Sequence, residues 1–217
     1  MRFDTDTGPL DAPVTTLIIA GWTGRDAAAV THHIKELAAI GIPAPSKTPL
    51  YYRVGASLLT QSDKIEVLGK GSSGEAEPLV VQAGGNLWLG LGSDHTDREF
   101  EKNSVAASKQ MCPKPVAPQL WSWTSVADRL DELVLSSEIF ENGAWVGYQK
   151  GALSKIRPLE ELIAAAGMKD GSAMMCGTLP AIGGVRPSAQ FRARLHDPKR
   201  DREITLTYAT TQLPLIT

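Results

Sequence analysis

Short β-type segments, separated by glycine, proline and polar turn residues, run through most of this 217-residue chain and favour a mainly β architecture. These segments are rich in β-branched and aliphatic residues or alternate between apolar and polar positions. An Asn142-Gly143 dipeptide inside residues 131–149 predicts a tight hairpin turn. Further strands are predicted over residues 14–20, 50–54, 64–68, 76–82, 86–91, 190–196 and 203–209.

Two short helices are predicted, over residues 25–40 and 159–166, and a glycine follows each of them. Strands and helices do not alternate in the strand–helix–strand rhythm of a parallel α/β protein. We therefore expect an α+β, mainly β fold with a curved or sandwich-like sheet. The proline-rich segment 112–118 should form an extended loop, and the glycine-rich segment 69–74 a turn, because it lacks the Lys-Ser/Thr end of a phosphate loop.

The charge balance and the apolar runs exclude several classes of partner. The chain has 22 Lys and Arg against 24 Asp and Glu, so it has no basic field for binding nucleic acid. Its apolar runs are much shorter than the roughly 20 residues that cross a bilayer, and its acidic first residues are unlike a signal peptide. Cys112 and Cys176 stand far apart, which excludes a disulfide framework. We expect a cytoplasmic protein with neither nucleic-acid nor membrane partners.

A Glu-x-Glu pair opens one predicted strand. Glu75 and Glu77 lie two residues apart, so their side chains should point to the same face. Two neighbouring carboxylates repel each other, and a hard divalent cation removes that repulsion by accepting their oxygens. The alternative is a solvated strand edge, which the neighbouring Pro78 supports.

Other candidate groups are spread along the chain. The segment Gly92–Arg98 (GSDHTDR) follows a predicted strand, and its oxygen-rich composition favours magnesium, manganese or calcium over zinc as a metal for His95 and its neighbours. Taken alone, a run of this kind is more often a solvated turn than a site. His33 and Glu36 share one face of a predicted helix, as a general-base pair or as a surface ion pair. Lys109 is either a ligand contact or a solvated charge, and the glycine-rich segment 177–184 either approaches a ligand closely or is a tight connection between strands.

In chain order these motifs resemble the pattern of the fumarylacetoacetate hydrolase superfamily, closest to a compact bacterial branch of unknown function. That pattern is His-x-x-Glu with a proline-rich link and a strand, Glu-x-Glu, Gly-Asn-Asp-Val-Ser-x-Arg, a Lys before Pro-Gly-Pro, and Thr-Gly-Thr-Pro-x-Gly-Val-Gly. The chain offers HHIKELAAIGIPAPSKTPLYYRV, Glu75-Ala-Glu77, GSDHTDR, Lys109 with CPKPVAP, and CGTLPAIGGV. The similarity covers residues 15–190 and implies one domain over residues 1–217, folded as a curved β-sandwich or roll with a few short helices.

The resemblance also implies a set of site residues. It makes Glu75, Glu77 and Asp94 ligands of Mg²⁺ or Mn²⁺, with Ca²⁺ as an occupant in crystals. Lys109 and Thr178 would contact carboxylate or enolate oxygens of the substrate, and Arg98 would position it. His33 and Glu36 would be the water-activating pair on a lid, and His33 is preferred to His32 because Glu36 follows it by three residues. The spacing from Glu77 to Asp94 is shorter than in the family, which requires a shorter hairpin.

The implied activity is hydrolysis of a carbon–carbon bond in a β-diketone or acylpyruvate-type keto acid through a stabilised enolate. Decarboxylation or isomerisation of a 2-oxo acid such as oxaloacetate uses the same enolate chemistry and is the main alternative. A non-catalytic binding protein that kept the fold is a second alternative. The resemblance and the apolar edge strands also lead us to expect a homodimer.

Overall fold

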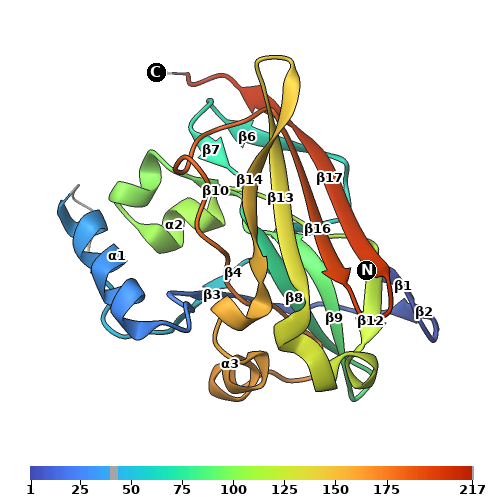
Figure 1. Ribbon diagram of the computed structural model, residues 1–217. Helices are drawn as coiled ribbons and strands as arrows, with labels where there is room; N and C mark the ends of the chain where they lie inside the picture. Colours follow the sequence, from blue (N-terminus) through green and yellow to red (C-terminus); the bar gives the residue numbers. More distant parts are fainter. Residues whose placement is uncertain (40–43, 217) are drawn as a thin grey trace.

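The computed structural model describes residues 1–39 and 44–216, without the side chains of His33 and Leu37. Two large β-sheets, two small two-stranded sheets and a few short helices make up the described chain (Figure 1). The prediction of a mainly β, α+β protein is confirmed. The sheets also show how residues far apart in the sequence come to share one site.

The larger sheet has eight strands and runs through the centre of the molecule. Its central strands are buried on both faces, and this explains the almost continuous apolar run Pro78–Val81 in one of them. One apolar cluster covers each face. In spatial order the strands are β2 (Gly8–Asp11), β1 (Arg2–Thr5), β12 (Gln119–Ser122), β9 (Asn86–Ser93), β8 (Ala76–Ala83), β15 (Ser172–Met175), β3 (Thr16–Gly21) and β4 (Leu50–Val54).

The second sheet has five strands and packs across β8 and β9 (Figure 1). Residues along strand β16 (Gln190–Asp197) alternate between buried and less buried positions, so one face supplies Phe191 and Leu195 to the core between the sheets. The strands predicted over residues 190–196 and 203–209 are confirmed, and they pair antiparallel with each other. In spatial order the strands are β14 (Ala144–Ala152), β13 (Val134–Glu141), β16 (Gln190–Asp197), β17 (Arg202–Leu213) and β6 (Lys64–Leu68).

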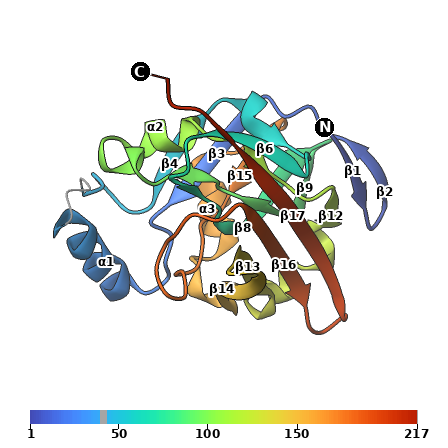
Figure 2. The same ribbon diagram turned by 90° about the horizontal axis from the view of Figure 1, so that it is seen from above.

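Short elements lie around the two large sheets. Helix α1 (Ala27–Ala39) begins after Asp26, whose carboxylate accepts hydrogen bonds from the amides of Ala28 and Ala29. It lies at the side of the molecule opposite β1 and β2 (Figure 2). None of the described helices is long and apolar enough to cross a membrane. The remaining elements are α2 (Val105–Gln110), α3 (Leu159–Ala166), β5 (Leu59–Thr60), β7 (Ser72–Ser73), β10 (Thr96–Asp97), β11 (Lys114–Pro115) and five 3-10 turns at 56–58, 100–102, 123–125, 127–132 and 153–155.

The pattern-based predictions succeed where periodicity or turn chemistry is strong. The hairpin at Asn142-Gly143 is confirmed, and two predicted strands match β4 and β6 in both bounds. Strand β15 was missed because its sequence, SAMM, has no β-branched residue, although it pairs with strands on both sides. The polar strands β1, β2 and β12 and helix α2 were also missed, and part of the glycine-rich segment 69–74 forms β7 rather than only a turn.

Gly74, just before β8, packs against side chains of the second sheet. A Cβ atom there would lie 2.8 Å from a ring carbon of Phe191 and would overlap the hydroxyl of Tyr208. That hydroxyl is hydrogen-bonded to both Ser93 and His95, so it has little freedom to move. The absence of a side chain at Gly74 therefore lets the second sheet reach the edge of the candidate site.

We expect Gly74→Ala to lower the free energy of unfolding by about 1–3 kcal/mol, the usual cost of overpacking a core. Urea unfolding measures this change. The control is Gly147→Ala, which makes the same substitution where no atom lies within 4 Å of the added Cβ, and should change stability by less than about 0.5 kcal/mol. Equal losses in the two variants would contradict the close-packing argument.

Candidate metal centre

Antiparallel pairing of β8 with β9 brings the carboxylates together. Ala76 pairs with Ser93, so Glu75 lies directly across from Asp94, and the Asp94 amide donates to the Glu75 carbonyl at 3.0 Å. Residues directly opposite in such a pair project to the same face, as do residues two apart in one strand. The shared face of Glu75, Glu77 and Asp94 therefore follows from the register.

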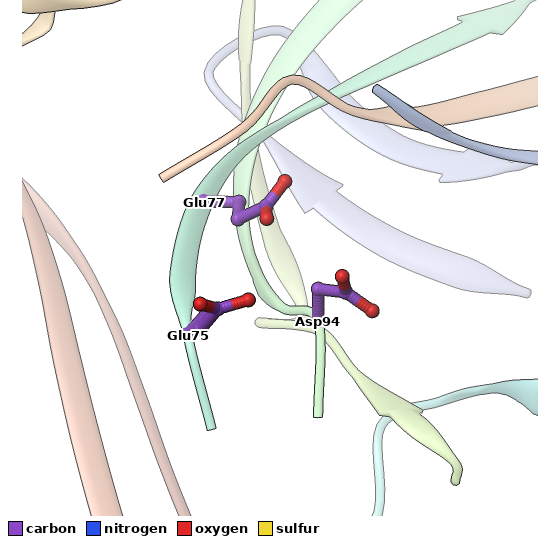
Figure 3. Close-up of side chains that lie close together, drawn as sticks. All are labelled: Glu75, Glu77 and Asp94. Atoms are coloured by element: carbon purple, nitrogen blue, oxygen red, sulfur yellow. The ribbon is translucent and has the colours of Figure 1, made fainter. Parts of the chain in front are cut away.

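The three side chains converge in the structure (Figure 3). Each offers a carboxylate oxygen, and these oxygens all lie within 4.8 Å of one another. Glu77 and Asp94 are buried, and Glu75 is only slightly exposed. A tight hairpin at Gly84-Gly85 joins β8 to β9.

Two lysines bind Asp94. The ammonium of Lys109, on α2, donates to Asp94 Oδ2, and the ammonium of Lys114, on β11, lies 2.9 Å from Oδ1. Burial alone would raise the pKa of the Asp94 carboxyl, but the two ammonium groups outweigh burial and hold that pKa well below its usual value. Asp94 is therefore ionised and ready to act as a ligand.

Arg98 binds Glu75 from the side. Its guanidinium lies 3.1 Å from a carboxylate oxygen of Glu75 and 3.1 Å from one of Glu101, and its Nε donates to the Ser73 hydroxyl at 2.7 Å. Burial opposes the charge on Arg98, but the two carboxylates outweigh burial and raise its pKa. Arg98 therefore forms an ion pair with Glu75, which is one of the predicted metal ligands.

Glu77 is held by the chain segment that follows β15. The amide of Gly177 donates to Glu77 Oε2 at 2.7 Å. Gly177 has φ +98°, and a Cβ there would overlap the hydroxyl of Thr23, so only glycine fits. Burial, together with the charges of Asp94 and Glu75, raises the pKa of Glu77 well above its usual value despite this amide.

Thr178 lies in the same segment, but its hydroxyl already makes two hydrogen bonds within the protein. It donates to the Ala76 carbonyl at 2.7 Å and accepts from the side-chain amide of Gln149 at 2.6 Å. A contact between this hydroxyl proton and a substrate anion requires the bond to Ala76 to break.

An aromatic pair borders Lys109. The ring centroid of Tyr52 lies 5.9 Å from the Lys109 ammonium, and Trp22 donates from its indole to the Tyr52 hydroxyl at 3.3 Å. Trp22 has φ +61°, which is unusual for a bulky residue and is typical of functional or strained positions. The ammonium of Lys109 therefore lies between a carboxylate and an aromatic ring.

His95 is not available as a metal ligand in this arrangement. Both ring nitrogens are hydrogen-bonded, one to the Tyr208 hydroxyl and the other to the Ser72 hydroxyl, each at 2.9 Å. Burial, together with the charges of nearby Lys114 and Arg98, lowers the pKa of His95 to about 3, so the ring is neutral at physiological pH. His95 joins the site to β7 and β17 instead.

The predicted His33–Glu36 pair lies on α1. The His33 side chain is outside the described part of the chain, so its direction is not described. Glu36 lies 3.3 Å from His32, and both of these side chains are exposed. The prediction that His33 and Glu36 act together therefore stays a prediction.

The donor set fits a hard divalent cation. Three carboxylates are the ligands that magnesium and manganese prefer. Asp94 Oδ1 is buried and receives no hydrogen bond of good geometry, although the Lys114 ammonium is near. Burial, and after it the charges of Asp94 and Glu75, raises the pKa of Glu77, and a cation bound between the carboxylates would favour the ionised form of Glu77.

Sequence reasoning missed several residues of the site. Lys114, Gln149 and Tyr208 lie on three different elements and are buried around the carboxylates. Gln149 and Tyr208 have no motif around them, and although Lys114 lies in the motif CPKPVAP, nothing in that motif marks its lysine as a partner of Asp94. Their role depends on long-range packing.

A family profile described as "Protein of unknown function (DUF2848)" matches residues 20–208, which is most of the chain. The chain belongs to the DUF2848 family. The matched region of this DUF2848 protein includes all three carboxylates and the segment after β15. Among functionally curated proteins, no sequence matches the chain.

Solved structures of several enzymes share the fold at low sequence identity. A 2-keto-3-deoxy-D-arabinonate dehydratase complexed with magnesium and 2,5-dioxopentanoate is 14% identical, with a TM-score of 0.65 over 96% of this chain and 76% of that one. An Escherichia coli protein described as a candidate isomerase is 15% identical, with a TM-score of 0.67 over 97% and 100%. A maleylpyruvate hydrolase from Sphingobium sp. SYK-6 is 13% identical, with a TM-score of 0.55 over 93% and 72%.

The ion pairs of Asp94 predict how the metal-free protein responds to substitution. Asp94→Asn leaves two buried ammonium groups without their carboxylate, so we expect the free energy of unfolding to fall by about 3–5 kcal/mol. Urea unfolding in EDTA measures this loss. In the matched Glu75→Gln variant, Arg98 keeps its ion pair with Glu101 and its hydrogen bond to Ser73, so the free energy of unfolding should fall by about 1 kcal/mol. Similar losses would show that the lysines do not depend on Asp94.

Proposed function

We propose that this DUF2848 protein is a divalent-metal-dependent enzyme of the fumarylacetoacetate hydrolase superfamily that acts on a small keto acid. The observation that carries the proposal is the convergence of Glu75, Glu77 and Asp94 within 4.8 Å, with the Lys109 ammonium on one of them. We propose further that residues 1–217 form one domain of this type and that the bound ion is Mg²⁺ or Mn²⁺.

The shared fold supports this proposal. The solved structures with this fold include enzymes of the fumarylacetoacetate hydrolase type, among them a keto-acid dehydratase and a hydrolase. One of them holds magnesium together with 2,5-dioxopentanoate, which is itself a 2-oxo acid. At 12–16% identity these structures support the fold, and the chemistry is inferred from the residues of this chain.

The charges of the cluster favour an anionic substrate. Four carboxylates, those of Glu75, Glu77, Asp94 and Glu101, face three cationic side chains, which are Lys109, Lys114 and Arg98. A divalent ion would leave the cluster with excess positive charge in a poorly solvated site. An anionic keto acid would restore the balance, so electrostatics favour keto-acid binding.

Each residue has a distinct role in this proposal. A bound divalent ion would act as a Lewis acid that stabilises an enolate. Lys109 keeps N–H donors beyond the one given to Asp94 and can donate to a substrate oxygen. Arg98 holds Glu75 in place and keeps the predicted substrate-positioning role. Thr178 contacts the substrate only if its hydroxyl turns away from Ala76.

The proposed reaction is hydrolysis of a carbon–carbon bond next to a carbonyl group. His33, oriented by Glu36, would accept a proton from water while the hydroxide adds to the carbonyl carbon. The carbon–carbon bond then breaks, and the enolate released takes up a proton at carbon. Without delivery of water the same site would support decarboxylation or isomerisation of a 2-oxo acid, which is our second candidate because related folds include a candidate isomerase.

Thermal unfolding tests the metal site directly. A ligand that binds only the folded state stabilises it by about 2.7 kcal/mol at one hundred times its dissociation constant. We expect Mg²⁺ and Mn²⁺ to raise the midpoint of the EDTA-treated protein by several degrees, and Glu75→Gln to abolish the shift. Glu75 is the best residue for this test because its replacement costs less stability than replacement of Asp94.

A control separates ligation from general weakening. Glu101→Gln removes the other carboxylate bound to Arg98 but leaves Glu75, Glu77 and Asp94 unchanged, so the metal shift should persist. If neither metal shifts the wild-type midpoint, the proposed enzyme is rejected in favour of the non-catalytic binding protein.

His33→Ala should reduce hydrolysis at least tenfold while leaving the metal-induced shift unchanged, because His33 is proposed to act on water rather than on the ion. Steady-state rates with acylpyruvates and β-diketones provide the measurement. His32→Ala is the matched control, because it changes the neighbouring histidine and breaks its contact with Glu36. A larger loss of activity with His32→Ala would move the role to His32.

Product analysis distinguishes the candidate reactions. Acylpyruvates, β-diketones and oxaloacetate are incubated with the metal-loaded protein, and the products are identified by NMR. A carboxylate fragment together with pyruvate from an acylpyruvate, or with a ketone from a β-diketone, indicates hydrolysis. Release of carbon dioxide indicates decarboxylation, and an unchanged formula indicates isomerisation. The proposed homodimer is tested separately by sedimentation velocity.

A further inference from the structure

Gln149 lies on β14, outside every motif considered so far, and its side chain is buried. The pairing of β13 with β14 shifts register between Ser137 and Glu138, so that β14 has one extra residue at Tyr148. Consecutive residues of a regular strand point to opposite faces, but Tyr148 and Gln149 are both buried here. The bulge therefore turns the Gln149 side chain toward the larger sheet.

The amide group of Gln149 uses its full hydrogen-bonding capacity. Its oxygen accepts from the Ala76 amide at 2.9 Å and from the Ser137 hydroxyl at 2.7 Å. Its nitrogen donates to the Thr178 hydroxyl at 2.6 Å and to the Leu179 carbonyl at 2.7 Å. The partners leave only one orientation of the amide, since a flipped group would place its NH2 against the Ala76 N–H.

These bonds replace part of a strand that is missing. Strand β15 pairs with β8 as far as Met175 and Leu79, and the Cys176 amide still donates to the Pro78 carbonyl. Beyond that point no residue of β15 remains to pair with Ala76. Gln149 accepts from the Ala76 amide, and Thr178 donates to the Ala76 carbonyl at 2.7 Å. The side chains of Gln149 and Thr178 therefore make the hydrogen bonds to Ala76 that a longer β15 would have made.

Ala76 lies between two of the proposed metal ligands, Glu75 and Glu77. The segment joined to it through Thr178 also contains Gly177, whose amide donates to the Glu77 carboxylate at 2.7 Å. Gln149 thus connects the backbone that carries two ligands to the loop that orients one of them.

We propose, on the basis of the metal site proposed above, that Gln149 is a positioning residue that sets the spacing of Glu75 and Glu77 for the metal ion. It does not contact the ion or the substrate. It acts through the Ala76 amide and the Thr178 hydroxyl. Groups that orient metal ligands in this way usually affect metal affinity by about 10- to 100-fold.

The test is Mn²⁺ binding to the full-length protein, measured by EPR of the free ion. Gln149→Met keeps the length of the side chain but removes its four hydrogen bonds, and we expect the dissociation constant to rise at least tenfold. Ser172→Ala is the control, because it removes a hydrogen bond of a buried side chain at the opposite end of β15 and should leave Mn²⁺ affinity within twofold. Thermal midpoints of both metal-free variants show whether stability alone explains the change.

The outcomes separate this inference from the proposed function. If the wild type binds Mn²⁺, Glu75→Gln does not, and Gln149→Met binds as the wild type does, the positioning role is wrong and the metal site stands. If the wild type does not bind Mn²⁺, the proposed function fails and this inference fails with it. If Gln149→Met does not fold, Thr178→Val breaks the same link from the other end. Unchanged Mn²⁺ affinity in that variant overturns the inference.

Discussion

The antiparallel pairing of β8 with β9 is the constraint on which the candidate site depends. One register places Glu75 across from Asp94 and puts Glu77 on the same face. A slip of one residue in either strand would turn the carboxylates of that strand to the opposite face. Burial of both strands on both faces prevents such a slip, because the apolar residues beside the site would then lose their places in the core. The packing of the sheet thus protects the geometry of the site.

Bringing three carboxylates into a poorly solvated place is unfavourable unless their charges are balanced. The chain supplies Lys109 from α2, Lys114 from β11 and Arg98 from the turn after β10. The balance is uneven, because Asp94 is strongly stabilised as an anion while burial and its neighbours raise the pKa of Glu77. Such a cluster tolerates the metal-free state but keeps a residual repulsion that a divalent ion would relieve.

The second sheet supports the site through hydrogen bonds from its strands β14 and β17. Tyr208 on β17 binds Ser93 and His95, and Gln149 on β14 binds Ala76, so two strands from the C-terminal half support β8 and β9 near their charged ends. Gly74 allows the close approach that these contacts need. Packing between the sheets therefore has a second consequence besides stability, since it restricts movement of the segments that carry the carboxylates.

The sequence by itself determined the mainly β class, the hairpin at Asn142-Gly143 and the common face of Glu75 and Glu77, because turn chemistry and the two-residue period of a strand are local properties. Only the tertiary structure decided the pairing partner of each strand, including β15, which has weak local signals and is stabilised by neighbours on both sides. It also decided the roles of Lys114 and Gln149. Their contacts join residues far apart in the chain, and no local pattern encodes a contact that forms only when two sheets pack together.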